Sequence, residues 1–173
     1  MLSSERGAYM GSEKAKLRRY EDDLNVSGTG ALIMGVWMLV KTLIQAMMTP
    51  IFKIDMSNED PALVPMIKVA IVVIISLLVC LSVLAHLYIG INAIRDARGK
   101  EYKKGYRKLS AFLMVLTLLG FAMYNDLLSR TETFLMSIAS MIVDVTSIYI
   151  FAIILRSSGK IKQLRAEQKR EDS

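Results

Sequence analysis

The sequence has very few of the residues from which metal and redox sites are built. It contains one cysteine, Cys80, and one histidine, His86, in 173 residues. A single cysteine excludes an intramolecular disulfide, a cysteine-based zinc site and a CxxC redox pair. No second cysteine or histidine stands at ligand spacing from His86, which disfavours a transition-metal site. We therefore expect neither a metal nor a cofactor.

The usual signatures of enzymes are also missing. The sequence has no glycine-rich phosphate-binding loop, and most of its Asp and Glu residues lie in charged blocks rather than beside candidate nucleophiles. Lipid-modifying enzymes usually carry clustered His, Asp or Glu near the membrane interface, and only a small group around Asp126 fits that description. We therefore expect that the protein is not an enzyme.

What the sequence does have is long apolar runs. Hydrophobic residues make up 53% of the chain and charged residues 22%, and the two kinds are separated into blocks. A helix needs about 20 apolar residues to cross a bilayer, and four stretches meet this length: 30–52, 66–94, 109–128 and 133–155. Because backbone polar groups must be satisfied internally in lipid, these spans should be helices. The pattern predicts an all-α, polytopic integral membrane protein with a four-helix transmembrane bundle, short outer loops and a basic central cytoplasmic loop.

The distribution of basic residues predicts the orientation of these spans. Five Lys/Arg lie before residue 28, seven between Arg95 and Lys108, and six from Arg156 onward, against three in the two remaining connections and the start of the second span. Basic residues are retained on the cytoplasmic side. We expect a cytoplasmic segment 1–27, a membrane domain 28–155 and a basic cytoplasmic tail 156–173. This pattern suits a multi-pass protein of a plasma (inner) membrane, and of a bacterial one.

The N-terminal segment leaves two alternatives open. Within residues 12–24, Leu17, Tyr20 and Leu24 are spaced as on one face of a short amphipathic helix. Such a helix could lie on the membrane surface, or the segment could be a partly ordered, solvated leader. The first apolar run begins after some thirty residues and is longer than the 7–15 residues of a signal-peptide core, so we expect a retained span.

Polar and small residues recur with a heptad spacing in the spans. In the fourth span they are Thr133, Ser137, Ser140, Asp144 and Ser147, and in the second Ser76, Val79, Val83, His86, Gly90 and Ala93. Small and hydroxyl residues allow transmembrane helices to approach closely and to share hydrogen bonds. These positions should therefore face the interior of the bundle.

Two full charges are expected near the middle of the membrane, Lys41 in the first span and Asp144 in the fourth. Each would cost roughly 2.5–3.5 kcal/mol if left alone in the bilayer centre. Opposite charge and similar depth predict a contact between them, with Gln45 one turn from Lys41. The pair could fix the register of the helices, serve as a proton or cation site, or meet a charged residue of another membrane subunit.

Three further groups of polar residues are candidates for function. His86 could relay protons or simply make a hydrogen-bonded helix contact. Tyr124, Asn125, Asp126 and Glu132 form a polar cluster that either ends the third span or lines the mouth of an outward cavity. The basic loop should contact anionic lipids or an acidic cytoplasmic partner through Arg95, Arg98, Lys100, Lys103, Lys104, Arg107 and Lys108.

Two functions follow as hypotheses. The first is a non-catalytic accessory, assembly or regulatory component of a membrane complex, with the bilayer, anionic lipids and another membrane protein or a second copy as partners. The second is a small proton- or cation-coupled transporter or channel that uses Asp144 and Lys41. The basic pI near 9.5 follows from the retention of positive charge on the inner side, so no nucleic-acid partner is expected.

Overall fold

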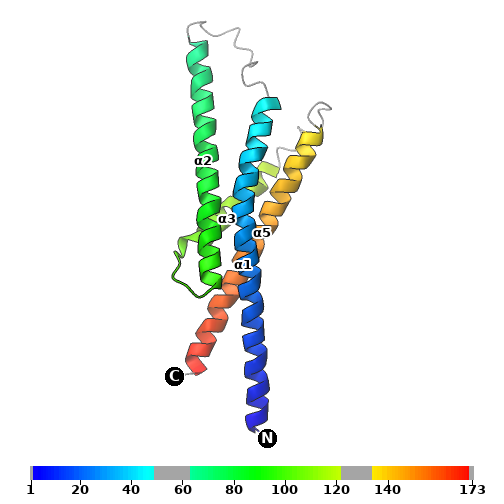
Figure 1. Cartoon of the computed structure of the whole chain (residues 1–173), viewed down its shortest axis with the longest axis vertical. Helices are drawn as coiled ribbons and strands as arrows, with labels where there is room; N and C mark the ends of the chain where they lie inside the picture. Colours follow the sequence, from blue (N-terminus) through cyan, green and yellow to red (C-terminus); the bar gives the residue numbers. More distant parts are fainter. Residues whose placement is uncertain (1, 49–62, 122–133, 172–173) are drawn as a thin grey trace.

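The computed structural model describes residues 2–48, 63–121 and 134–171, and the regular structure that they form is entirely helical. The helices are α1 (Leu2–Met48), α2 (Val64–Ala97), α3 (Gly105–Phe121) and α5 (Phe134–Glu171). In Figure 1, α1 and α2 run side by side in opposite directions and α5 crosses α1. Helix α3 packs on α5 and, over a smaller area, on α2. The prediction of an all-α fold is confirmed.

Three of these helices are long and apolar enough to cross a membrane, over Glu13–Leu43, Val64–Ala97 and Ser137–Arg170. Helix α3 has 17 described residues, and the rest of the predicted third span lies outside the described residues. The most apolar stretch of α2 is not buried inside the molecule at all, and side chains such as Leu77 and Leu81 are about two-thirds exposed. An apolar surface of this extent fits contact with lipid and not with water.

Helices α1 and α5 continue well past the apolar runs that identify their spans. Residues 12–24 are part of one helix that continues into the first span, and α5 continues from the end of the fourth span to Glu171. An apolar run indicates which part of a helix suits lipid, whereas a helix ends only where a capping residue or a breaker ends it. Figure 1 shows the N-terminus and the C-terminus at the same end of the molecule, which we call the terminal end.

Helix α2 begins and ends with the signals expected for a helix. Pro65 lies in its first turn, where a missing backbone N–H costs nothing. At the other end Gly99 adopts a φ of 65°, and its N–H donates to the Asp96 carbonyl oxygen at 3.1 Å. A left-handed residue after a helix is most often glycine, because glycine has no Cβ to clash. This short turn brings the start of α3 back against the end of α2.

Small residues form the contact between α1 and α2. Ala31 of α1 and Ala93 of α2 are completely buried, and Gly28 and Gly90 are buried beside them. A Cβ added to Gly90 would lie 2.7 Å from the Gly28 carbonyl oxygen, so the two backbones are almost in contact. This close approach is the kind that small residues permit between membrane helices.

Substitution at this contact should be costly. Gly90→Ala places a methyl group 2.7 Å from the Gly28 oxygen and 2.6 Å from the Leu32 side chain, so we expect a loss of about 1–3 kcal/mol in unfolding free energy. Gly159→Ala is the matched control, because a Cβ there meets nothing within 4 Å and alanine favours a helix. Denaturant titration in detergent micelles measures both. Equal stability of the two variants would contradict the close contact.

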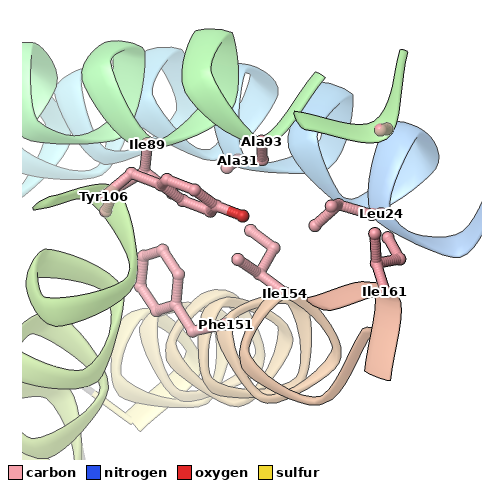
Figure 2. Packing of buried hydrophobic residues seen from close by; sticks show 9 residues of the cluster. Leu24, Ala31, Ile89, Ala93, Tyr106, Phe151, Ile154 and Ile161 are labelled. Atoms are coloured by element: carbon pink, nitrogen blue, oxygen red, sulfur yellow. The ribbon is translucent and has the colours of Figure 1, made fainter. Parts of the chain in front are cut away.

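The core lies at the level where all four helices meet. In Figure 2, Phe151, Ile154 and Ile161 of α5 point toward α1 and α2, and the Tyr106 ring from α3 lies between them. Leu24, Ile89, Ile154 and Ile161 are each at most 1% exposed. The core therefore sits near the terminal end rather than at the centre of the apolar spans.

The inward face of α5 is continuous along almost the whole helix. Its positions recur at alternating steps of three and four residues: Ser137, Ser140, Asp144, Ser147, Phe151, Ile154, Ser158, Ile161 and Arg165. All except the half-buried Arg165 are buried. The heptad seam predicted for residues 133–147 thus extends five further positions toward the C-terminus, and three of these, Phe151, Ile154 and Ile161, are apolar.

Away from the terminal end, α1 and α2 separate. A groove of about 550 Å³ opens between them, lined by apolar residues of both helices such as Leu39, Val72, Ile75 and Val83. Ser76, which the predicted seam of α2 places in the interior, is exposed beside this groove. The predicted seam positions of α2 are therefore buried only from His86 onward.

Candidate functional site

Lys41 and Asp144 form an ion pair between α1 and α5. Lys41 Nζ donates to Asp144 Oδ1 at 2.8 Å and to Oδ2 at 2.9 Å. The side chains are 14% and 9% exposed, respectively. Asp144 occupies a position of the α5 seam, one turn from Ser140 and one turn from Ser147, so the helix itself directs the carboxylate toward α1. The contact expected from charge and depth is present within one chain.

The surroundings of this pair are mainly apolar. A cavity of about 250 Å³ borders Lys41 and Ser140, and its other lining residues are Trp37, Val40, Ala139, Ile142 and Val143. Ser147, on the seam, is completely buried and donates to the Val143 carbonyl oxygen at 2.9 Å. Such a hydroxyl satisfies its own helix. The two charges of the ion pair thus neutralise each other in mainly apolar surroundings.

His86 is buried between helices and makes one hydrogen bond. Its Nδ1 atom lies 2.8 Å from the Ser82 carbonyl oxygen, so Nδ1 is the donor in this hydrogen bond. Within the described residues Nε2 has no hydrogen-bond partner. The ring packs against Phe151, with 5.4 Å between ring centroids, and a Cβ on Gly35 would lie 2.9 Å from the His86 Cβ. His86 of α2 therefore contacts both α1 and α5.

The remaining polar candidates within the spans are not described. The side chain of Gln45 and all of Tyr124, Asn125, Asp126 and Glu132 lie outside the residues whose placement the structure gives. Their interpretation as a hydrogen-bond partner of the ion pair and as an outer cluster remains a prediction.

The basic residues of the α2–α3 turn divide into two groups. Exposed side chains belong to Arg95, Arg98, Lys100, Lys103, Lys104 and Lys108, and these residues are available to lipid headgroups or to a partner. Arg107 differs, because its side chain is only 23% exposed and its Nη2 atom lies 3.1 Å from Asp96 Oδ2. Its main contact is therefore within the protein.

Asp96 is the centre of a second polar site, which the sequence analysis did not identify. Its side chain is 1% exposed. The Tyr106 hydroxyl donates to Oδ2 at 2.5 Å, Arg107 donates to the same oxygen, and Arg165 Nη1 donates to Oδ1 at 3.2 Å. Arg165 Nη2 also donates to Glu21 Oε1 at 2.9 Å and to the Asp96 backbone oxygen at 2.9 Å. We call these five residues the Asp96 cluster.

The charges of the Asp96 cluster balance, and its members come from all four helices. Two carboxylates, Asp96 and Glu21, face two guanidinium groups, Arg107 and Arg165. Burial, together with the hydrogen bond to Asp96, raises the pKa of the Tyr106 phenol above its ordinary value, which keeps the phenol protonated as a donor. The cluster is suited to fastening the terminal ends of the helices together.

A neighbouring hydrogen-bond chain orders the turn that carries the cluster. Asn92 Nδ2 donates to the Tyr88 carbonyl oxygen at 2.8 Å, and Asn92 Oδ1 accepts from the Lys103 backbone N–H at 2.9 Å. The amide of one buried asparagine thus ties the turn to α2. A buried polar group satisfied in this way fixes the local conformation.

One signal in the sequence could have led to the Asp96 cluster. The heptad spacing of the fourth span, continued past residue 155, reaches Ser158, Ile161 and Arg165. A single acidic residue, Asp96, between Arg95 and Arg98 is then a natural partner for an inward-facing arginine. The basic tail conceals this pattern because all of its charges suit the cytoplasmic side equally well.

Neither a family nor a metal site emerges from further comparison. Comparisons of the chain with models of protein families, with curated proteins and with solved structures give no match. Within the part of the chain that the structure describes, no three His, Cys, Asp or Glu side chains are grouped as ligands for a metal ion. The two polar sites and the arrangement of the helices are thus the basis for inferring a function.

Proposed function

We propose that the protein is a four-span membrane bundle that serves as a non-catalytic accessory, assembly or regulatory subunit of a membrane complex. In this proposal α3, continued through residue 128, is the third of the four spans. Both termini and the α2–α3 turn lie on the cytoplasmic side of a bacterial plasma membrane. The positive-inside distribution supports this orientation, and so does the position of both termini at one end of the molecule.

The observation that carries the proposal is the closed ion pair of Lys41 and Asp144. A transport site in a membrane needs a charged group that can exchange its partner for an ion or a proton. Here the carboxylate meets the ammonium group through both oxygens, at 2.8 and 2.9 Å, and the adjoining cavity is mainly apolar. A pair of this kind suits helix registration better than ion passage.

The exposed part of α2 supports assembly. From Val69 to Leu84 its large apolar side chains are mostly exposed, and the apolar groove separates this part of α2 from α1. In a bundle that acts alone, this stretch would contact only lipid. In a complex it offers a long, smooth helix face to a span of another subunit, where van der Waals packing stabilises the contact.

Photo-crosslinking tests this proposal. A photoreactive phenylalanine analogue placed singly at Ile74, Leu77, Leu78 and Leu81 in native membranes should give a protein adduct of one constant mass at neighbouring positions on one helix face. The same analogue placed at Tyr149 of α5, which is 65% exposed, measures the background of adducts that arise from random collisions.

Lipid adducts alone at all four positions of α2 would argue against an assembly role. Proton flux in proteoliposomes, if it exceeded that of protein-free vesicles and disappeared in Asp144→Asn, would establish the second candidate, a proton-coupled transporter. One observation favours that candidate, namely the buried His86 Nε2 atom, which has no hydrogen-bond partner among the described residues.

A further inference from the structure

Helices α1 and α5 project past the α2–α3 turn and diverge toward their ends, as Figure 1 shows. A groove of about 900 Å³ lies between them. We call it the terminal groove. Its lining is Lys14, Ala15, Leu17, Arg18, Arg19, Glu21, Asp22 and Asp23 of α1 with Gln168 of α5.

The walls of the terminal groove are held in place by contacts at its base. Leu24 of α1 and Ile161 of α5 are both buried in the core, and Figure 2 shows the two side chains close together. Arg165 of α5 bridges Glu21 of α1 and Asp96 of α2. The groove is therefore a preformed feature, which reduces the entropy that a ligand would lose on binding.

Charges along the α1 wall follow a definite order. The basic lining residues Lys14, Arg18 and Arg19 come first, and Glu21, Asp22 and Asp23 follow. The basic end is the more distant from the bundle, and the acidic end adjoins the core. On the α5 side the lining residue is the uncharged Gln168. Leu17, which packs partly against the core, gives the groove an apolar strip.

This order of charges disfavours an anionic lipid surface as the ligand. Headgroups attract basic residues that lie next to the membrane. In the proposed orientation the acidic residues of the terminal groove lie between its basic residues and the membrane. A ligand whose own charge changes sign along its length matches the groove better.

We propose that the terminal groove binds an amphipathic helix of a partner protein that has acidic residues over Lys14 and Arg18 and basic residues over Asp22 and Asp23. The inference rests on the proposed assembly function and specifies the partner's chemistry. The α1 wall from Lys14 to Asp23 is about 15 Å long at 1.5 Å per residue, which matches three turns of a partner helix. Apolar residues on one face of that helix would contact Leu17.

Binding of synthetic peptides to the full chain tests the inference. Three fluorescein-labelled 14-residue helices share an alanine and leucine face. The first has glutamates in one half and lysines in the other, the second has glutamates in both halves, and the third has glutamine at every charged position. With the protein in phosphatidylcholine nanodiscs, fluorescence anisotropy should give an affinity for the first peptide at least about tenfold higher than for either other peptide. Tightest binding of the second peptide would reduce the groove to a simple basic patch and overturn the proposal.

Protein variants locate the site. Lys14→Glu with Arg18→Glu should weaken the first peptide about tenfold or more, because it replaces attraction by repulsion at the groove. Lys103→Glu with Lys104→Glu changes the net charge equally at exposed positions of the α2–α3 turn, and the affinity should stay within about twofold. Equal losses in the two variants would overturn the proposal.

Anionic nanodiscs separate a protein ligand from a lipid one. Addition of phosphatidylglycerol should leave binding of the first peptide to the unsubstituted protein largely intact. If phosphatidylglycerol instead abolishes this binding, and does not change the residual binding of the variant with Lys14→Glu and Arg18→Glu, the groove binds lipid headgroups. The peptide assay uses the isolated chain. A negative result would therefore contradict the ligand proposed for the terminal groove but would not change the crosslinks expected from α2. Absence of those crosslinks, in turn, would contradict the assembly function without altering the peptide affinities.

Discussion

Asp96→Asn is expected to lower the unfolding free energy by about 3 kcal/mol, a value typical of removing one member of a buried ion pair. The substitution keeps the shape of the side chain but removes the charge that Arg107 and Arg165 share. Both arginine side chains are partly exposed, at 23% and 30%, so solvation by water offsets part of the lost interaction energy. Denaturant titration in detergent micelles measures the change.

Two variants serve as controls for this result. Asp22→Asn removes an exposed carboxylate from α1, and we expect a change within about 0.5 kcal/mol. Asp96→Asn combined with Arg165→Gln should cost less than the sum of the two single changes, because the residues are in direct contact. Strict additivity would show that Arg165 does not depend on Asp96.

The ionisation of Tyr106 gives an independent readout of the same cluster. Burial and then the Asp96 hydrogen bond hold the pKa of the phenol above its ordinary value. Asp96→Asn replaces the charged acceptor by a neutral one and retains Arg107, so the pKa of the Tyr106 phenol should fall. Ultraviolet titration identifies this phenol by difference from Tyr106→Phe. An unchanged pKa would mean that burial alone accounts for the shift.

Lys41→Met and Asp144→Asn should each destabilise the protein by about 2–3 kcal/mol, since each leaves an uncompensated charge in an apolar environment. The double variant should recover most of the loss, with a coupling energy of about 1–3 kcal/mol. Both expectations follow from the bidentate contact at 2.8 and 2.9 Å. The four proteins are compared by unfolding in micelles.

The outcome distinguishes the two functions. Lys162→Met, an exposed position on α5, controls for loss of a lysine and should change stability little. If the losses at Lys41 and Asp144 simply add, or if Asp144→Asn stabilises, the carboxylate is not held by Lys41. Asp144 would then be an available charge in the membrane, as a transporter requires.

The apolar helices and the Lys41–Asp144 pair follow from simple sequence signals. Hydropathy places the long helices because lipid requires about 20 consecutive apolar residues. Heptad spacing places Ser140, Asp144 and Ser147 on the inward face of α5, and all three are buried. Charge of opposite sign at similar depth then leads from Asp144 to Lys41.

The Asp96 cluster could not be predicted in the same way. Asp96 and Arg165 are 69 residues apart. Although the heptad spacing of the fourth span, when continued, reaches Arg165, no hydropathy period marks Asp96 as a buried position. Their contact depends on α5 continuing as a helix beyond the apolar run and on Gly99 turning α3 back toward α2. The Gly99 turn has a local signal, but tertiary packing decides how far α5 continues and which residues then meet.

The continuity of α1 has a mechanical consequence. At 1.5 Å per residue its 47 residues form a rod about 70 Å long, more than twice the roughly 30 Å hydrocarbon thickness. The tight contact of Gly28 with Gly90 lies near the middle of this rod. Ion pairs with α5 lie on both sides of it, Glu21–Arg165 toward the N-terminus and Lys41–Asp144 toward the other end. The rod is thus fastened at three levels along its length.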